Sequence, residues 1–196
     1  MRKLVIVSIF AFCFVVPKLQ AQRYLPGMRG LQVTTGGVNA LNQNKGFHTS
    51  TTLSNHWGAA LSTYTKRADR WVFGAEYLEK KYPYNDLIIP QSQFTVDGGY
   101  YYKFLSDSRK TFFMSVGASV LAGYETINWN EKLLPDGATI KNSDAFLFGG
   151  ALTLELEIYL TDRLVLLSNI RQRLLSGSTV GKFNTQFGAG IKIIIN

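Results

Sequence analysis

The chain has 196 residues, one cysteine and a formal net charge of +8 at neutral pH, a length that fits one domain. The only thiol, Cys13, lies in an N-terminal apolar segment. The rest of the chain therefore has no disulfide, no thiolate metal site and no cysteine nucleophile. The basic residues are scattered singly or in pairs rather than clustered, which argues against direct contact with nucleic acid.

The N-terminus has the anatomy of a secretory signal peptide. Two basic residues precede an apolar segment (residues 4–16), and a small residue, Ala21, follows a few positions later. This order of a basic, an apolar and a small-residue region is what signal peptidase recognises. We expect cleavage between Ala21 and Gln22, so that residues 1–21 are a signal peptide and residues 22–196 are the exported domain.

Beyond the signal, apolar side chains recur at every second position, which is the period of a β-strand. No later stretch offers the roughly 18 consecutive apolar residues of a membrane helix. We therefore expect an all-β fold with eight strands, near residues 30–36, 56–66, 70–80, 93–105, 112–124, 146–160, 164–173 and 183–195.

The links between the expected strands alternate between short and long. Short polar turns are expected at 67–69, 106–109 and 161–163, and longer links at 38–54, 83–92, 125–143 and 176–181. Short turns on one rim and longer loops on the other are typical of an outer-membrane β-barrel.

Two soluble folds, a β-sandwich and a lipocalin-type barrel, also alternate polar and apolar positions. They place the large apolar side chains inside, whereas here the polar face is rich in glycine, serine and opposed charges that suit a narrow lumen. The apolar face carries aromatic residues towards the strand ends, as membrane-interface girdles do: Trp57, Trp71, Tyr77, Phe104, Phe112, Tyr124 and Phe146. The pattern favours an eight-stranded antiparallel up-and-down outer-membrane β-barrel with its apolar face towards lipid.

The segment GALTLELEIYL sharpens the question of which face is inside. Its leucines alternate with Glu155 and Glu157, and a carboxylate turned to the bilayer centre would cost roughly 2–4 kcal/mol. A turn at 161–163 would place Glu155 opposite Asn169 and diagonal to Arg171, so Arg171 is its expected partner.

Other charged residues share this inward parity and predict a lumen filled by ion pairs, since eight strands leave room only for side chains. The expected network is Glu76, Asp97, Lys103, Glu155, Glu157, Arg171, Arg173 and Lys192. The alternative is a selective pore or a paired-carboxylate acid/base site.

No catalytic, cofactor or metal site is indicated by the residue pattern. His48 and His56 are the only histidines, and neither stands in a nucleophile elbow or a metal-binding signature. We therefore expect a protein that is not an enzyme and needs no cofactor.

The last expected strand resembles the C-terminal signal that the barrel-insertion machinery reads. The pattern places a polar residue at Gln186, a glycine at Gly188 and apolar residues at Ile191 and Ile193. The usual terminal aromatic residue is missing, because the sequence ends in Ile-Asn.

Three parts of the chain together resemble the TraO family of conjugal transfer proteins from Bacteroides-type conjugative transposons. They are QRYLPGMRG at 22–30, the run from WVFGAEYLEKKYPY to YYYKFLSD at 71–107, and the closing segments YLTDRLVLL and VGKFNTQFGAGIKIIIN at 159–167 and 180–196. The resemblance covers nearly all of the chain after the signal. Its motifs are structural and include no catalytic residues.

This resemblance implies a non-enzymatic component of a conjugative DNA-transfer (mating) apparatus in the outer membrane of a Gram-negative bacterium. Outer-membrane lipid and other transfer proteins are then the expected partners, with the loops at 38–54 and 125–143 as contact surfaces. Two alternatives stay open: a small outer-membrane barrel enzyme or lipid-binding protein, and a soluble periplasmic β-sandwich of the secretion channel.

Overall fold

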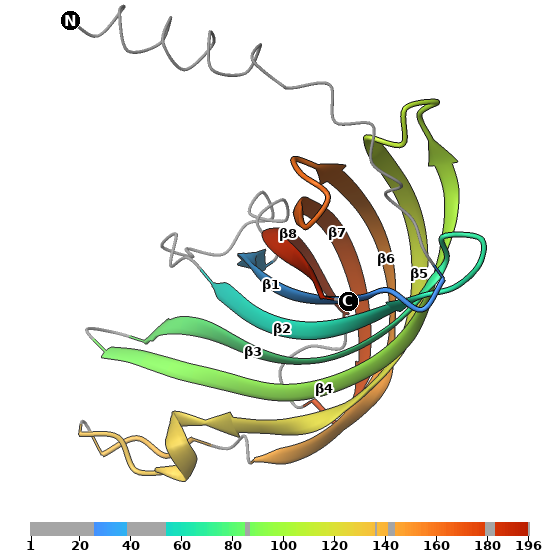
Figure 1. Ribbon diagram of the computed structural model, residues 1–196. Helices are drawn as coiled ribbons and strands as arrows, with labels where there is room; N and C mark the ends of the chain where they lie inside the picture. The colour runs from blue at the N-terminus through green and yellow to red at the C-terminus, as the bar shows by residue number, and fades with distance from the viewer. Residues whose placement is uncertain are drawn as a thin grey trace, which may run out of the picture.

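The computed structural model describes residues 26–38, 54–84, 87–135, 137–140, 144–178 and 183–195. Each strand pairs antiparallel with the next, and the last pairs with the first, so the sheet closes into a barrel (Figure 1). The predicted eight-stranded up-and-down barrel is confirmed, and the β-sandwich is wrong. The strands are β1 (Arg29–Val38), β2 (Asn55–Tyr64), β3 (Arg70–Tyr84), β4 (Leu87–Ser106), β5 (Phe112–Ile127), β6 (Ala145–Tyr159), β7 (Leu164–Ser176) and β8 (Phe183–Ile195).

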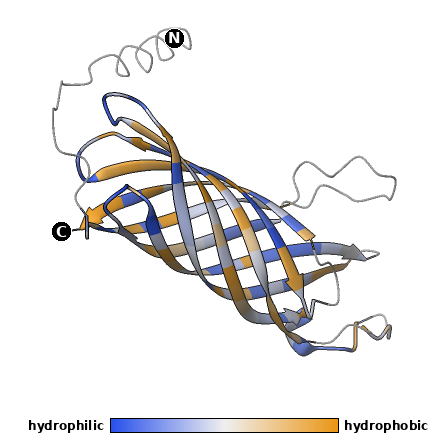
Figure 2. Ribbon diagram, turned by 90° about the vertical axis from the view of Figure 1, so that its right-hand side faces the viewer, coloured by the Kyte–Doolittle hydropathy of each residue, from blue (hydrophilic) through white to orange (hydrophobic). Residues whose placement is uncertain are grey.

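The barrel is apolar outside and polar inside. Along β6, Leu152 is 64% exposed, whereas Glu155 and Glu157 are 2% and 0% exposed. Figure 2 shows hydrophobic and hydrophilic residues alternating along the strands around the barrel. A soluble lipocalin-type barrel would show the opposite arrangement, because its large apolar side chains fill the interior.

The two rims of the barrel differ in how they join strands. The turn rim carries the short links, residues 65–69, 107–111 and 160–163, together with the described ends of β1 and β8. There Gly27 N donates to Tyr64 O at 2.8 Å, and Ile194 N donates to Arg163 O at 2.8 Å. The opposite rim, here called the loop rim, carries the links β1–β2, β3–β4, β5–β6 and β7–β8.

The expected loop at 83–92 is wrong, because β3 and β4 stay paired up to Tyr84 and Leu87. β2 ends opposite Glu79, and β5 ends opposite Gln91. The tip of the β3–β4 hairpin therefore projects past both neighbouring strands as a two-stranded ribbon.

Two prolines explain why the sequence suggests a loop there. Pro83 and Pro90 each lack a backbone donor, which argues against a central strand. On the projecting ribbon each strand has one free edge, and proline is tolerated at such an edge.

Two apolar clusters lie inside the barrel. One, near the turn rim, consists of Tyr64, Phe113, Tyr159, Val165, Leu167 and Ile194, with Met28 packed against it. The other, nearer the loop rim, consists of Leu121, Leu147, Ala151 and Leu175. Most of the remaining inward side chains are polar or charged, and they form the site described next.

Candidate functional site: a charge-filled lumen and an exposed loop

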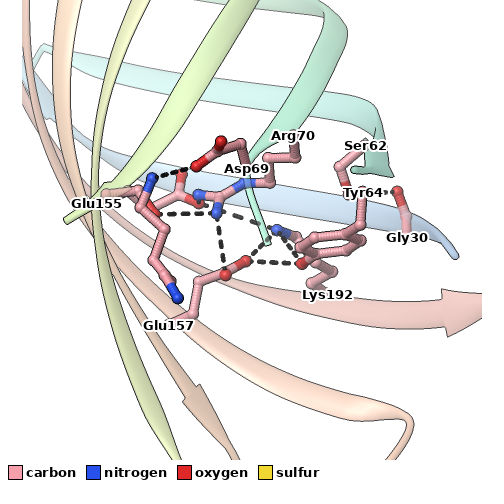
Figure 3. Close-up of polar contacts among 10 residues, drawn as sticks. Gly30, Ser62, Tyr64, Asp69, Arg70, Glu155, Glu157 and Lys192 are labelled. Carbon is pink, nitrogen blue, oxygen red and sulfur yellow. Dashed lines mark hydrogen bonds and ion pairs between the residues drawn. The ribbon is translucent and has the colours of Figure 1, made fainter. Parts of the chain in front are cut away.

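Arg70 is the centre of the turn-side cluster, which consists of Tyr64, Arg70, Glu155, Glu157 and Lys192 (Figure 3). Its Nη2 lies 2.6 Å from Glu155 Oε1, and its Nη1 lies 3.0 Å from Glu157 Oε2. The guanidinium also stands 5.0 Å from the centre of the Tyr101 ring, within the range of a cation–π contact. One buried cation thus crosses the lumen from β3 to hold two carboxylates of β6.

Lys192 and Tyr64 complete this cluster around Glu157. Lys192 Nζ donates to Glu157 Oε1 and, at 3.1 Å, to the Tyr64 hydroxyl. Tyr64 Oη in turn donates to Glu157 Oε1 at 2.9 Å. Two cations therefore face two carboxylates, and the pair of glutamates is a structural tie rather than an acid and a base poised for catalysis.

A second group, the central cluster, consists of Glu76, Asp97, Arg171, Arg173 and Gln186. Arg171 Nη2 lies 2.7 Å from Asp97 Oδ2, and its Nη1 lies 3.4 Å from Glu76 Oε2. Arg173 Nη1 lies 2.8 Å from Glu76 Oε1, and Gln186 Nε2 donates to the same oxygen at 2.6 Å. Side chains of β7 and β8 here reach across to β3 and β4.

The predicted contact between Glu155 and Arg171 is wrong, although the predicted strand register is correct. Glu155 pairs with Asn169, and Thr153 pairs with Arg171, as expected from the turn at 161–163. Arg171 nevertheless turns to the opposite wall, and Glu155 takes Arg70 instead. In a narrow barrel a long side chain can reach a strand across the lumen as easily as its neighbour.

Lys103 does not join the ion pairs that the structure describes. Its side chain is only partly buried, next to an irregularity in pairing between Lys103 and Leu105. Its backbone N donates to Asp69 Oδ1 at 2.9 Å. The remaining seven residues of the expected network all lie in the turn-side or the central cluster.

A third group, the loop-side cluster, was missed by the sequence prediction. It consists of Lys80, Gln91, Gln93, Glu125 and Asn184. Gln91 Nε2 and Gln93 Nε2 donate to Glu125 Oε2 at 2.6 and 2.7 Å. Lys80 Nζ donates to the side-chain oxygen of Asn184.

Lys80 lies on β3 beyond Glu79, the last residue paired with β2. Burial lowers its pKa to about 8, Glu125 opposes this shift and Arg173 adds to it. Lys80 shares the inward parity of Glu76 and lies within the strand expected at 70–80, so this parity could have identified it. Arg70, at the other end of the same expected strand, could have been found in the same way.

Within the three clusters the charges balance. The cations are Arg70, Lys80, Arg171, Arg173 and Lys192, and the anions are Glu76, Asp97, Glu125, Glu155 and Glu157. The described lumen therefore offers no excess charge that would attract one type of ion. Its ion pairs occupy the space that a channel would need.

Of the two histidines, one lies among the described residues. His48 lies outside the described residues, and His56 is buried in the lumen, 3% exposed. Within the described ranges there is no cluster of three or more His, Cys, Asp or Glu that could hold a metal ion. The predicted signal peptide, with Ala21 and Gln22, also lies outside the described residues.

The four residues of the expected insertion signal all lie on β8. Gln186 faces the lumen, where it donates to Glu76, and Gly188 lies against the Asn169 side chain. Ile191 and Ile193 are exposed on the outer face. Their role in insertion stays a prediction.

The structure describes residues 128–135, 137–140 and 144 of the β5–β6 link on the loop rim. Its first turn, η1 (Asn128–Asn130), holds three consecutive residues at φ 49°, 52° and 68°, a left-handed run that is rare outside glycine. Asp144 anchors this turn: its Oδ1 accepts from Ile127 N at 3.1 Å, and its Oδ2 accepts from Tyr124 Oη at 3.1 Å. The link presents Trp129, 63% exposed, and Leu133, 71% exposed.

Aromatic residues on the outer face line up across strands below that loop. Trp57 pairs with Tyr77, Tyr77 with Phe94, Phe94 with Tyr124, and Tyr124 with Phe146. A row of this kind is typical of the girdle at a membrane–water interface. No helix among the described residues is long and apolar enough to cross a membrane.

The chain matches the family model described as conjugative transposon protein TraO over residues 25–195. It belongs to the TraO family. The family resemblance expected from the sequence is thereby confirmed. No curated protein matches the chain in a sequence comparison.

Solved structures that resemble this TraO-family chain are bacterial surface and outer-membrane barrels. Neisserial surface protein A matches with a TM-score of 0.57 at 13% identity, covering 84% of this chain and 96% of that one. Ail, the attachment invasion locus protein of Yersinia pestis, matches in complex with sucrose octasulfate with a TM-score of 0.56 at 7% identity, covering 87% of this chain and 100% of that one. At such low identity these similarities show the fold alone.

Proposed function

We propose that this TraO-family chain is a non-enzymatic outer-membrane component of a conjugative DNA-transfer apparatus and acts through contacts of its rims with other transfer proteins. The family membership supplies the process, and the apolar outer face with its aromatic row supplies the membrane location. In this proposal residues 1–21 direct export, the turn rim faces the periplasm and the loop rim faces outwards.

The observation that carries the proposal is the filled lumen. Ion pairs in the turn-side and central clusters join opposite walls of the barrel. This supports a role in which neither DNA nor a solute passes through the barrel. The surfaces that remain available for binding other proteins are the rims and loops, where binding residues are commonly found.

The β5–β6 link is the contact surface that the described residues favour. A left-handed run of non-glycine residues costs roughly 1–2 kcal/mol per residue, and backbone strain of this kind is commonly kept where it serves function. Here Trp129 is exposed on a turn whose preceding residue, Ile127, donates its N–H to Asp144. Tryptophan is enriched among the residues that dominate protein interfaces.

A deletion of the gene, scored for mating frequency, tests the process. We expect transfer to fall and to be restored by the wild-type chain expressed from a second site. Undiminished transfer from the deletion strain would contradict a role in conjugation. Fractionation of the same cells should recover the chain with the outer membrane, and recovery in the soluble periplasm would contradict the membrane location.

Two loop variants test the contact surface in the complemented strain. Trp129→Ala with Leu133→Ser should lower transfer while the barrel still folds and reaches the membrane. Leu160→Ser on the turn rim is the matched control, because Leu160 is also an exposed apolar residue next to a strand end. Equal transfer by both variants would contradict a role for the β5–β6 link and leave the family role standing.

A further inference from the structure

A small cavity lies inside the barrel, next to residues of both the turn-side and the central clusters. It measures about 40 Å³ and is lined from both clusters, by Glu155 on one side and by Glu76, Asp97, Arg171 and Gln186 on the other. We infer that this cavity is a binding site for a small group of ordered water molecules. The inference is independent of the proposed role in conjugation.

Small residues on two adjacent strands create the cavity. Gly58 and Ala60 on β2 and Gly74 on β3 all line it. A Cβ added at Gly58 would approach Thr34 Oγ1 to 3.1 Å, and one added at Gly74 would approach Ala60 Cβ to 2.8 Å. Both distances are tight, so a larger side chain at either glycine would have to displace these neighbours.

Polar atoms without a protein partner surround this space. Gln32 Oε1, His56 Nδ1, Gln186 Oε1 and Arg171 Nε are buried and have no hydrogen-bond partner among the described atoms, and all four residues line the cavity. Exchanging the amide oxygen and nitrogen of Gln186 would not give its oxygen a partner, because Nε2 donates to the Glu76 carboxylate at 2.6 Å. A carboxylate oxygen accepts this bond, so the amide oxygen must face elsewhere.

The mixture of groups selects water as the ligand. The two glutamine oxygens can only accept a hydrogen bond, whereas the arginine Nε–H can only donate one. An anion would accept a hydrogen bond from the arginine but would be repelled by the amide oxygens. A metal cation would bind the amide oxygens but would be repelled by the arginine. Water both donates and accepts, and a water typically needs about 10–15 Å³ of such space and 2–4 polar partners. The cavity therefore has room for about three.

Ion pairs lie next to the cavity on two sides. Glu155, which pairs with Arg70, and Glu76, which pairs with Arg173, both line it. The bound waters would accordingly be part of the fold, as buried waters generally are, and would not form a continuous path from one rim to the other.

Crystals of the full-length exported chain, examined at 2 Å or better with and without xenon pressure, test the inference directly. We expect discrete density for waters within hydrogen-bond distance of Gln32 Oε1, His56 Nδ1 or Gln186 Oε1, and no xenon in the cavity. Xenon settles in dry apolar cavities. A xenon peak there, or a cavity without density in crystals that order other buried waters, would overturn the inference.

A matched pair of variants gives a second test in solution. Ala60→Leu would push an aliphatic side chain into the cavity, whereas Ala59→Leu adds the same atoms to the outer face of the same strand. If the cavity holds water, Ala60→Leu should unfold at a lower urea concentration than Ala59→Leu, because the displaced waters leave polar atoms unpaired. An equal or higher midpoint for Ala60→Leu would mean a dry space that the side chain fills, and would overturn the inference. Ala60→Ser is the control for folding. If Ala60→Ser folds and Ala60→Leu does not, the failure of Ala60→Leu counts as the lower midpoint.

Discussion

A single arginine at the start of β3, which the sequence pattern did not single out, holds the turn-side cluster together. Arg70 bonds to Glu155, Glu157 and Ser115, and its side chain is 0% exposed. Removing one partner of a buried pair leaves the other charge uncompensated, which typically costs about 3–5 kcal/mol. The stability of the turn-side cluster should therefore depend strongly on this one side chain.

We expect Arg70→Met to lower the free energy of unfolding by about 3–5 kcal/mol. Urea titration of the barrel in lipid vesicles, followed by the gel mobility of unboiled samples, measures this change. Lys103→Met is the matched control, because Lys103 forms no ion pair among the described residues. Its effect should stay within about 0.5 kcal/mol. Similar losses of unfolding free energy for both variants would contradict the assignment of Arg70 as the residue that holds the turn-side cluster together.

The charge partners show where sequence reasoning stops at the residue scale. The period of two decides which way Glu155 and Glu157 point, because a strand sends alternate side chains to opposite faces. Which cation each carboxylate pairs with depends on the width and the strand stagger of the closed barrel. The residue pattern of a single strand carries no information about either. Neighbouring-strand rules therefore give the register of Glu155 correctly and its partner incorrectly.

At the scale of the strands, the sequence predicts well how many strands there are and which side chains face the lumen. It predicts poorly where each strand begins and ends. β3 and β4 continue through two prolines because their tip is a free-standing ribbon, whereas proline rules are calibrated on strands paired at both edges. The turn from β4 to β5 behaves as expected: Asp107 Oδ1 accepts from Thr111 N at 2.6 Å and closes it. Its strain lies at Lys110, where φ is 54°.

We expect Lys110→Gly to stabilise the barrel by about 1 kcal/mol, because glycine adopts a positive φ without the steric penalty of a side chain. Lys110 is exposed, so the change removes no buried contact. Arg109→Gly next to it should instead destabilise slightly, since the φ of Arg109 is not positive and glycine only adds freedom to the unfolded chain. The same urea titration measures both, and a loss of stability for Lys110→Gly would contradict the strain assigned to this turn.

For the molecule as a whole, the lumen replaces the apolar core of a soluble protein. Its centre is made of balanced ion pairs, while the apolar side chains face outwards. Lipid can only cover such a surface if the backbone has no open edge, and the closure of β8 on β1 removes it. The fold and the charge network are thus consequences of one arrangement, and both argue against a conducting pore.

Reconstitution into planar lipid bilayers tests this conclusion for the intact barrel. We expect no stepwise conductance above the noise in 1 M KCl, because ion pairs join opposite walls in both the turn-side and the central clusters and eight strands leave space only for side chains. A porin inserted in the same bilayers shows that channels would be detected, and the gel mobility of the recovered protein shows that it stayed folded. Conductance steps that scale with salt concentration would mean that the ion pairs open. They would favour a selective pore over a closed barrel.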